Sequence, residues 1–154
     1  MVSVTKNTLS TQLPFYIRDV LRNNLTDPAS RTTHWIFKSN PEMDFDTDDF
    51  PIIIIDVDTQ SSISIGLDGS KYIPRDIVLG ITIYHDDQKE RDEIADEVRY
   101  TLLNPDSEDS NGDSLREKQI KCISITEATR DTYIKYPKML RVKEMICTFR
   151  YYGG

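Results

Sequence analysis

The feature that most constrains the fold is a run of four isoleucines, Ile52 to Ile55, in the segment PIIIIDVDTQ. β-Branched residues favour extended backbone, and successive side chains of a strand point to opposite faces. A strand of this composition is therefore apolar on both faces and needs cover on each, from helices, a neighbouring layer or another subunit. We interpret Asp56 and Asp58, which follow directly, as the point where the strand leaves the core and enters water.

Helical spacing of apolar residues predicts an amphipathic helix from Leu9 to Leu25. Ser10 or Thr11 is expected to cap it, which would confine Pro14 to the first turn, where proline is tolerated. After it, the segment HWIFKS, residues 34–39, has the composition of a short strand.

The clearest strand signal is RDIVLGITIY, which begins at Arg75 and places alternate apolar residues on one face. It leads into a second amphipathic helix, DQKERDEIADEVRYTLL, with Asp86 or Asp87 as N-cap. The apolar stripe predicted for this helix is Ile94, Ala95, Val98, Leu102 and Leu103. Before this strand, SSISIGL is expected to align Ile63, Ile65 and Leu67 ahead of a turn at Asp68-Gly69, and Asp58-Thr59-Gln60 is either a connection or a bend in one long strand.

The last third predicts an exposed polar loop from Asn104 to Asp113, followed by two long strands, LREKQIKCISITEAT and MLRVKEMICTFRYYGG. Within the second strand the apolar residues change from even-numbered positions (Leu140, Val142) to odd-numbered ones (from Met145 onward), so a bulge or bend is expected near Lys143-Glu144. Adjacent runs of strands, rather than strict alternation with helices, predict a single α+β domain over residues 1–154. We expect a mostly antiparallel sheet flanked by the N-terminal helix and the central amphipathic helix.

A formal charge of −7 argues against broad binding to nucleic-acid phosphates. Arg116, Lys118 and Lys121 could form a local basic face, but a solvated strand edge is the favoured interpretation. The two cysteines, Cys122 and Cys147, lie apart in predicted strands and are expected to be free thiols. We expect a soluble protein made in a reducing cytoplasm, because the N-terminal residues do not resemble a signal peptide and no apolar run is long enough for a membrane span.

Acidic residues raise the question of a metal site. Asp56 and Asp58 could share one face of a strand and bind a divalent cation, but no further ligand pattern follows them. In the acidic loop of residues 40–50, aspartates at 44, 46 and 48 match the first positions of a calcium loop. Asp49 then stands where that motif requires glycine, and Ile55 where it requires glutamate, which excludes an EF-hand and leaves at most a weak adventitious site.

Catalytic motifs are also lacking in the sequence, which contains only His34 and His85 as histidines and no GxSxG, HExxH or glycine-rich phosphate loop. We therefore predict a protein that is not an enzyme, with no catalytic, cofactor-binding or metal-ligating residues assigned. The alternative is a small metal-dependent hydrolase that uses Asp56, Asp58 and His85. Two aromatic pairs, Trp35 with Phe37 and Tyr151 with Tyr152, are expected in the core or in a subunit interface rather than as stacking platforms for nucleic acid.

The layout resembles the tail terminator, or tail completion, proteins of long-tailed bacteriophages and related viruses. The resemblance is carried by the N-terminal helix, the PIIIIDV strand, RDIVLGITIYHDDQKERDEIADEVRYTLL running from strand to helix, and the final strands ending in EMICTFRYY. It covers the chain from about Leu9 to Tyr152 and includes no catalytic motif.

The resemblance implies a structural protein of the virion tail and neck. Members of the family form a hexameric ring that caps the tail tube, ends its polymerisation and provides a docking surface for head-completion proteins. The implied partners are further copies of this chain, the tail-tube protein and a head-completion or stopper protein of the neck, with DNA only passing through the lumen and no membrane contact. The acidic loops at residues 44–49 and 106–113 are candidates for the lumen or rims, where they would repel DNA phosphates. The closest alternative is a head–tail adaptor or stopper protein of the neck.

Overall fold

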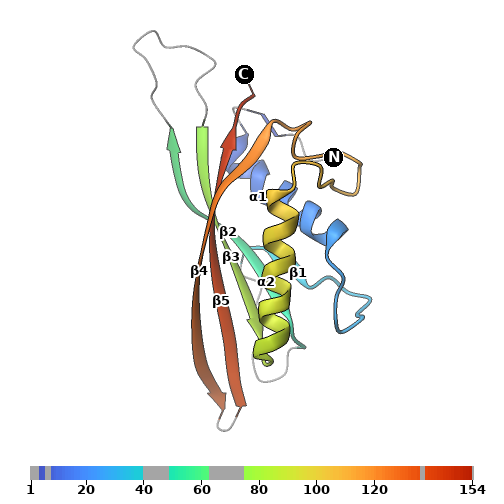
Figure 1. Ribbon diagram of the computed structural model, residues 1–154, viewed down its shortest axis with the longest axis vertical. Coiled ribbons are helices and arrows are strands. Elements are labelled where there is room, and N and C mark those ends of the chain that lie inside the picture. The colour runs from blue at the N-terminus through green and yellow to red at the C-terminus, as the bar shows by residue number, and fades with distance from the viewer. Residues whose placement is uncertain (1–3, 6–7, 40–48, 63–74, 136–137, 154) are drawn as a thin grey trace.

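The computed structural model describes residues 4–5, 8–39, 49–62, 75–135 and 138–153. It is an α+β fold, as predicted, with two helices and a five-stranded mixed sheet (Figure 1). In chain order the elements are α1 (Leu9–Asn24), β1 (Ile36–Lys38), β2 (Ile52–Ser62), β3 (Arg75–His85), α2 (Gln88–Leu103), β4 (Ile120–Lys135) and β5 (Lys138–Tyr151).

The strands are arranged in the order β1-β2-β3-β5-β4. The β2–β3, β3–β5 and β5–β4 pairings are antiparallel, and the short β1 runs parallel to β2. Ile81 lies between Ile55 of β2 and Met145 of β5, which places the middle of β3 at the centre of the sheet.

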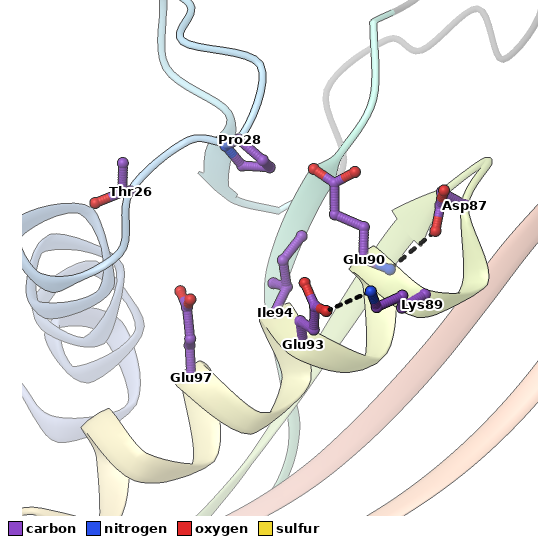
Figure 2. A pocket seen from close by; sticks show the side chains of 8 residues that line it. All are labelled: Thr26, Pro28, Asp87, Lys89, Glu90, Glu93, Ile94 and Glu97. Carbon is purple, nitrogen blue, oxygen red and sulfur yellow. Dashed lines mark hydrogen bonds and ion pairs between the residues drawn. The ribbon is translucent and has the colours of Figure 1, made fainter.

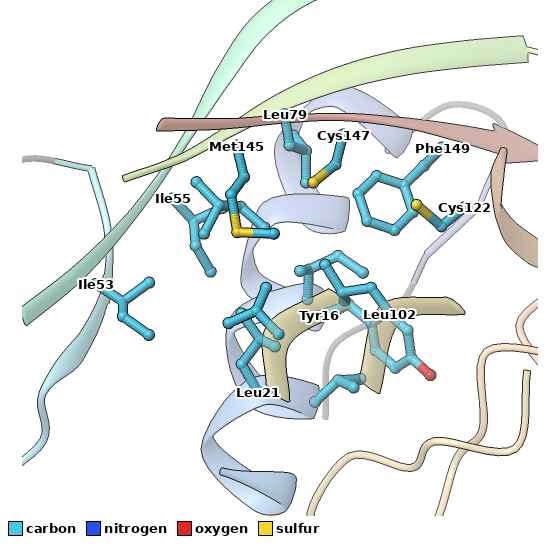
Figure 3. Packing of buried hydrophobic residues seen from close by; sticks show 14 of the residues in the cluster. Tyr16, Leu21, Ile53, Ile55, Leu79, Leu102, Cys122, Met145, Cys147 and Phe149 are labelled. Carbon is cyan, nitrogen blue, oxygen red and sulfur yellow. The ribbon is translucent and has the colours of Figure 1, made fainter. Parts of the chain in front are cut away.

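Both helices pack on the same face of the sheet (Figure 1). Tyr16 and Leu21 of α1 and Leu102 of α2 lie in one buried cluster with side chains of the central strands (Figure 3). The sheet residues of this core include Ile53, Ile55, Ile77, Leu79, Ile81, Ile83, Met145, Cys147 and Phe149. Their alternation along β2, β3 and β5 follows from the two-residue period of a strand that has one face toward the helices.

The isoleucine run is buried on both faces, as predicted: Ile52 to Ile55 are each no more than 6% exposed. Asp56, Val57 and Asp58 are exposed, so the strand does reach water at this point. It does not end there, because β2 continues to Ser62 after a register shift between Val57 and Thr59. Of the alternatives left open by the sequence, a bend within one long strand is therefore correct.

The predicted N-cap of α1 is wrong, although the helix starts at Leu9 as expected. Thr8 occupies the N-cap position, rather than Ser10 or Thr11. Pro14 consequently lies in the second turn, where it cannot donate a backbone hydrogen bond to the carbonyl of Ser10. Its ring is buried, and burial of apolar surface beside the core offsets the lost hydrogen bond.

The bulge predicted in the last strand is also wrong, because β5 pairs with β3 without interruption from Arg141 to Tyr151. The parity changes because different faces are buried along the strand. Leu140 and Val142 are buried on the face opposite the helices, whereas Arg141 and Lys143 occupy the helix-side positions and form ion pairs. The bulges of this hairpin lie in β4, between residues 122 and 124 and between residues 133 and 135.

The loop from Asn104 to Asp113 is exposed only in part, although its composition predicts an exposed excursion. Asp109 is only 2% exposed, and its carboxylate accepts the backbone N–H of Asp113 at 2.9 Å. The Tyr16 hydroxyl of α1 donates to the carbonyl of Asp113 at 2.8 Å. The loop can be partly buried because its polar groups find hydrogen-bond partners within the fold.

Three expectations lie outside the described residues. They are the apolar alternation of Ile63, Ile65 and Leu67, the turn at Asp68-Gly69, and the calcium-loop spacing of Asp44, Asp46 and Asp48.

Candidate functional site

The residues of the alternative metal site are not brought together. Asp56 lies opposite Gly80 in the register of β2 and β3, whereas His85 lies five residues farther along β3. At a rise of about 3.3 Å per residue, this separates the two positions by roughly 17 Å along the sheet. Among the residues that the structure describes, no group of three histidine, cysteine or acidic side chains could hold a metal ion.

His85 supports the β3–α2 junction. It is 4% exposed, and its Nδ1 accepts the backbone N–H of Asp86 at 2.9 Å. Asp87 is the N-cap of α2, as predicted, and its side chain accepts the Glu90 N–H at 2.9 Å. Helix capping thus accounts for Asp87, whereas the exposed carboxylate of Asp86 lies 2.9 Å from the His85 Nδ1. His34 is exposed in the connection before β1.

Both cysteines are buried free thiols on the helix side of neighbouring strands (Figure 3). Burial raises the pKa of the Cys122 thiol to about 11 and also raises the pKa of Cys147. A thiol held in its protonated form is a poor nucleophile, so neither side chain has the environment of a reactive cysteine.

The members of the predicted basic face and of the two predicted aromatic pairs differ in their pairing and exposure. Arg116 pairs with Asp106 at 3.2 Å and Lys118 with Asp113 at 3.5 Å, while Lys121 at the start of β4 is exposed. Trp35 is buried, Phe37 is half-buried and Tyr151 is buried in the core cluster, in contrast to Tyr152, which is 47% exposed.

An acidic groove runs along the flank of α2 that faces the α1–β1 connection (Figure 2). Thr26 and Pro28 of that connection lie across from the acidic side chains of α2, and the first part of the groove has a volume of about 340 Å³. The groove continues toward the C-terminal end of α2 as a second hollow of about 460 Å³, which shares Thr26 and Glu97 with the first. The residues along it from α2 and its N-cap are Asp87, Lys89, Glu90, Glu93, Ile94, Asp96, Glu97, Tyr100 and Thr101.

A cavity of about 330 Å³ lies at the C-terminal end of α2, between the helix, the following loop and the start of β4. We call it the apolar pocket. Its walls include Leu102, Leu103, Leu115, Cys122 and Tyr152. Arg116 and Lys121 also line it and bring positive charge to a mainly apolar site, whose lining further includes Gln119.

Exposed apolar side chains gather around this end of α2. Tyr100 is 75% exposed, Leu103 51% and Tyr152 47%. Leu103 departs from the predicted buried stripe, whose other members, Ile94, Ala95, Val98 and Leu102, are buried. Exposed apolar groups that border a cavity are typical of a surface that binds a partner.

The outer side of β4 is the long edge of the sheet. β4 has 16 residues and pairs with β5, and within the described part of the chain no strand pairs with its other side. Ile123 is 38% exposed, and Thr126, Ala128 and Arg130 are also exposed. A long unpaired edge presents backbone donors and acceptors that a neighbouring molecule can use.

Sequence reasoning missed both the acidic groove and the apolar pocket. The acids of α2 were visible as the polar face of an amphipathic helix, but the wall of the groove comes from residues more than fifty positions earlier. The pocket likewise needs Leu103, Lys121 and Tyr152 to meet from three separate segments.

Comparison with known proteins gives no family for this chain: neither a scan against models of protein families nor a search of curated proteins finds a match. Neither helix in the described residues is both long and apolar enough to span a membrane.

Proposed function

We propose that this chain is a structural subunit of a virus tail, which forms a ring that caps the tail tube, stops its polymerisation and offers a docking surface to the head-completion proteins of the neck. The proposal extends the resemblance stated from the sequence. The ring would be hexameric and would lie in the virion neck, and DNA would only pass through its lumen.

The observation that carries the proposal is the long unpaired edge at β4. A three-residue strand, β1, forms the opposite edge, so the sheet is short and partly protected on one side and long on the other. Monomeric proteins commonly shorten or cover such edges, whereas a ring subunit can use them against its neighbours. The N-terminal helix and the helix after the RDIVLGITIY strand, which are part of the layout on which the resemblance rests, form a layer on one face of the sheet.

The acidic loops fit this proposal in part. Asp106 and Glu108 are exposed, so the loop from Asn104 to Asp113 can present negative charge toward a lumen or rim. Asp109 is excluded from that role because it is buried. In the other loop, only Asp49 lies within the described residues, and it is exposed.

The test is the mass of the purified chain in solution, measured by light scattering with and without polymerised tail-tube protein and with and without a chelator. A mass six times the 17.8 kDa of one chain, alone or on the tube, with no effect of the chelator, is the expected result. A monomer that ignores the tube but binds divalent cations would overturn the proposal and direct attention to Asp56 and Asp58.

A further inference from the structure

We propose that the apolar pocket receives Tyr100 of a second copy of this chain, so that subunits join head to tail through α2. This inference rests on the proposed function for the idea that copies associate, and it identifies the residues that make the contact. It depends on two surfaces of the same molecule that complement each other in shape and in charge.

The receiving surface is an apolar cavity bordered by positive charge. Its volume of about 330 Å³ is at the lower end of the range of ligand pockets, which suits a single aromatic side chain better than a cofactor. Lys121 is exposed and makes no ion pair within the described part of the chain. Arg116 pairs with Asp106, but 67% of its side chain remains exposed, so it can also reach a carboxylate of a partner.

The inserting surface is an exposed tyrosine bordered by negative charge. Tyr100 is 75% exposed, the highest exposure among the large apolar side chains that the structure describes. Asp96 and Glu97 precede it by four and three residues, which places them beside it on the same face of α2. Both are exposed. An aromatic ring flanked by carboxylates therefore matches an apolar pocket flanked by a lysine and an arginine.

The two surfaces lie on different flanks of α2. Tyr100 borders the groove whose other wall is formed by Leu25 and Thr26, on the α1 side. The pocket is bounded by Lys121 and Cys122 of β4, on the opposite side. A contact between two different patches is heterologous. After the first contact forms, one copy keeps a free pocket and the other keeps a free Tyr100. Such contacts close into a ring when the rotation between neighbours permits it.

The contact is tested with Tyr100→Ala. Tyr100→Phe is the matched control, because it keeps the aromatic ring of the side chain. Sedimentation velocity over a range of concentrations, with and without tail-tube protein, measures association of the subunits. Tyr100→Ala is expected to raise the dissociation constant by about tenfold or more, the loss typical of an aromatic anchor, while Tyr100→Phe stays close to the original protein. Circular dichroism verifies that both variants fold.

Charge reversal tests the pairing more sharply. Glu97→Lys and Lys121→Glu should each weaken association when present alone. An equimolar mixture of the two variants should restore it, because every contact in an alternating assembly is again between opposite charges. Asp58→Lys, on the exposed bulge of β2 away from both surfaces, is the control for a general change of net charge.

The results separate this inference from the proposed function. If the chain assembles on the tail tube but Tyr100→Ala and the two charge reversals assemble equally well, the contact assigned to α2 is wrong and the proposed function stands. If the chain associates through Tyr100 but does not bind the tube, the contact stands and the proposed function fails. A chain that remains monomeric both alone and with tail-tube protein would overturn the inference.

Discussion

At the scale of single residues, the start of α2 depends on one carboxylate. Asp87 accepts the backbone N–H of Glu90 and so satisfies one of the unpaired donors in the first turn. Asp86, its neighbour, lies instead against the ring of His85, with 2.9 Å between Oδ1 and Nδ1. The sequence offered both acids as caps, and only the direction of each side chain distinguishes them.

We expect Asp87→Ala to lower the free energy of unfolding by about 1 kcal/mol, because it removes the cap of α2. Asp87→Asn, whose side-chain oxygen can accept the same hydrogen bond, should remain close to the original protein. Urea unfolding followed by circular dichroism measures both. Equal losses in the two variants would show that charge, and not capping, is what this position contributes.

The loss of stability of the fold at acid pH should arise in part from protonation of the Asp92 carboxylate. Its pKa is lowered chiefly by a hydrogen bond from Lys143, whose Nζ lies 2.9 Å from Oδ1, and further by the guanidinium of Arg91. A carboxylate whose pKa is lower in the folded state stabilises the fold above the pKa of the unfolded chain, about 3.9, and loses that contribution as the pH falls through the folded value.

Lys143→Met should therefore reduce the loss of stability between about pH 5 and pH 2, compared with the original protein. The measurement is the midpoint of thermal unfolding across that pH range. If the two proteins lose stability in parallel, the lowered pKa of Asp92 does not contribute to acid unfolding.

The buried thiols predict a chemical signature. At pH 8, a thiol-specific disulfide reagent should react slowly with the folded protein and fast with both cysteines in denaturant. Burial raises the pKa of Cys122 to about 11, which leaves little reactive thiolate, and Cys147 is fully inaccessible. A rapid reaction of one thiol per folded chain would contradict this and would identify Cys122, at the apolar pocket, as accessible.

At the scale of elements, the loop after α2 and the helix α1 stabilise each other. Asn24 of α1 donates to the Glu108 carbonyl at 2.9 Å, and Tyr16 donates to the Asp113 carbonyl. Burial is the main reason that the pKa of Tyr16 is raised, and carboxylates such as Asp109 and Asp113 add to the shift. The loop therefore forms part of the support for α1.

We expect Tyr16→Phe to cost about 1 kcal/mol in the free energy of unfolding, because the part-buried hydrogen bond from the Tyr16 hydroxyl to the Asp113 carbonyl is lost, while the ring and the hydrogen bond from the Asp109 N–H remain. Hydrogen exchange should show faster exchange at Asp113 and its neighbours before any change in the central strands. Uniform acceleration over the whole sheet would indicate that the loop unfolds only together with the core.

The element boundaries show where periodicity is informative. The alternation of β3 and the stripe of α2 were predictable because a single face of each is apolar over many residues. The predicted bulge in β5 failed because a change of parity can mean a bend or a change in which face is buried. At that end of the strand, Arg141 and Lys143 meet Asp131 and Asp92 on the helix side, which no local pattern reveals.

At the scale of the whole molecule, net charge and local charge act in opposite directions. Copies of a chain with a formal charge of −7 repel each other, whereas the proposed contact joins a basic pocket to acidic residues. Salt screens both effects. If the local pairing dominates, raising the salt from about 0.05 M to about 0.5 M should weaken self-association several-fold.

Sedimentation of the original protein across that salt range measures whether attraction at the contact or repulsion between whole subunits dominates. Lys121→Glu should lose the salt-dependent weakening, since it removes one member of the pairing. Association that strengthens with salt in the original protein would show that repulsion between whole subunits outweighs the contact at the apolar pocket.

The sequence by itself determined the α+β class, the two-sided burial of Ile52 to Ile55, the strand and helix on either side of His85, and the place where β2 reaches water. Each depends on side-chain period and composition within a short segment, and such local preferences agree with the final fold. Only the tertiary structure decided the parallel pairing of β1, the burial of Asp109, and the meeting of Leu103, Lys121 and Tyr152 around one pocket. These features join residues distant in the chain, and their energies depend on partners that no local pattern can specify.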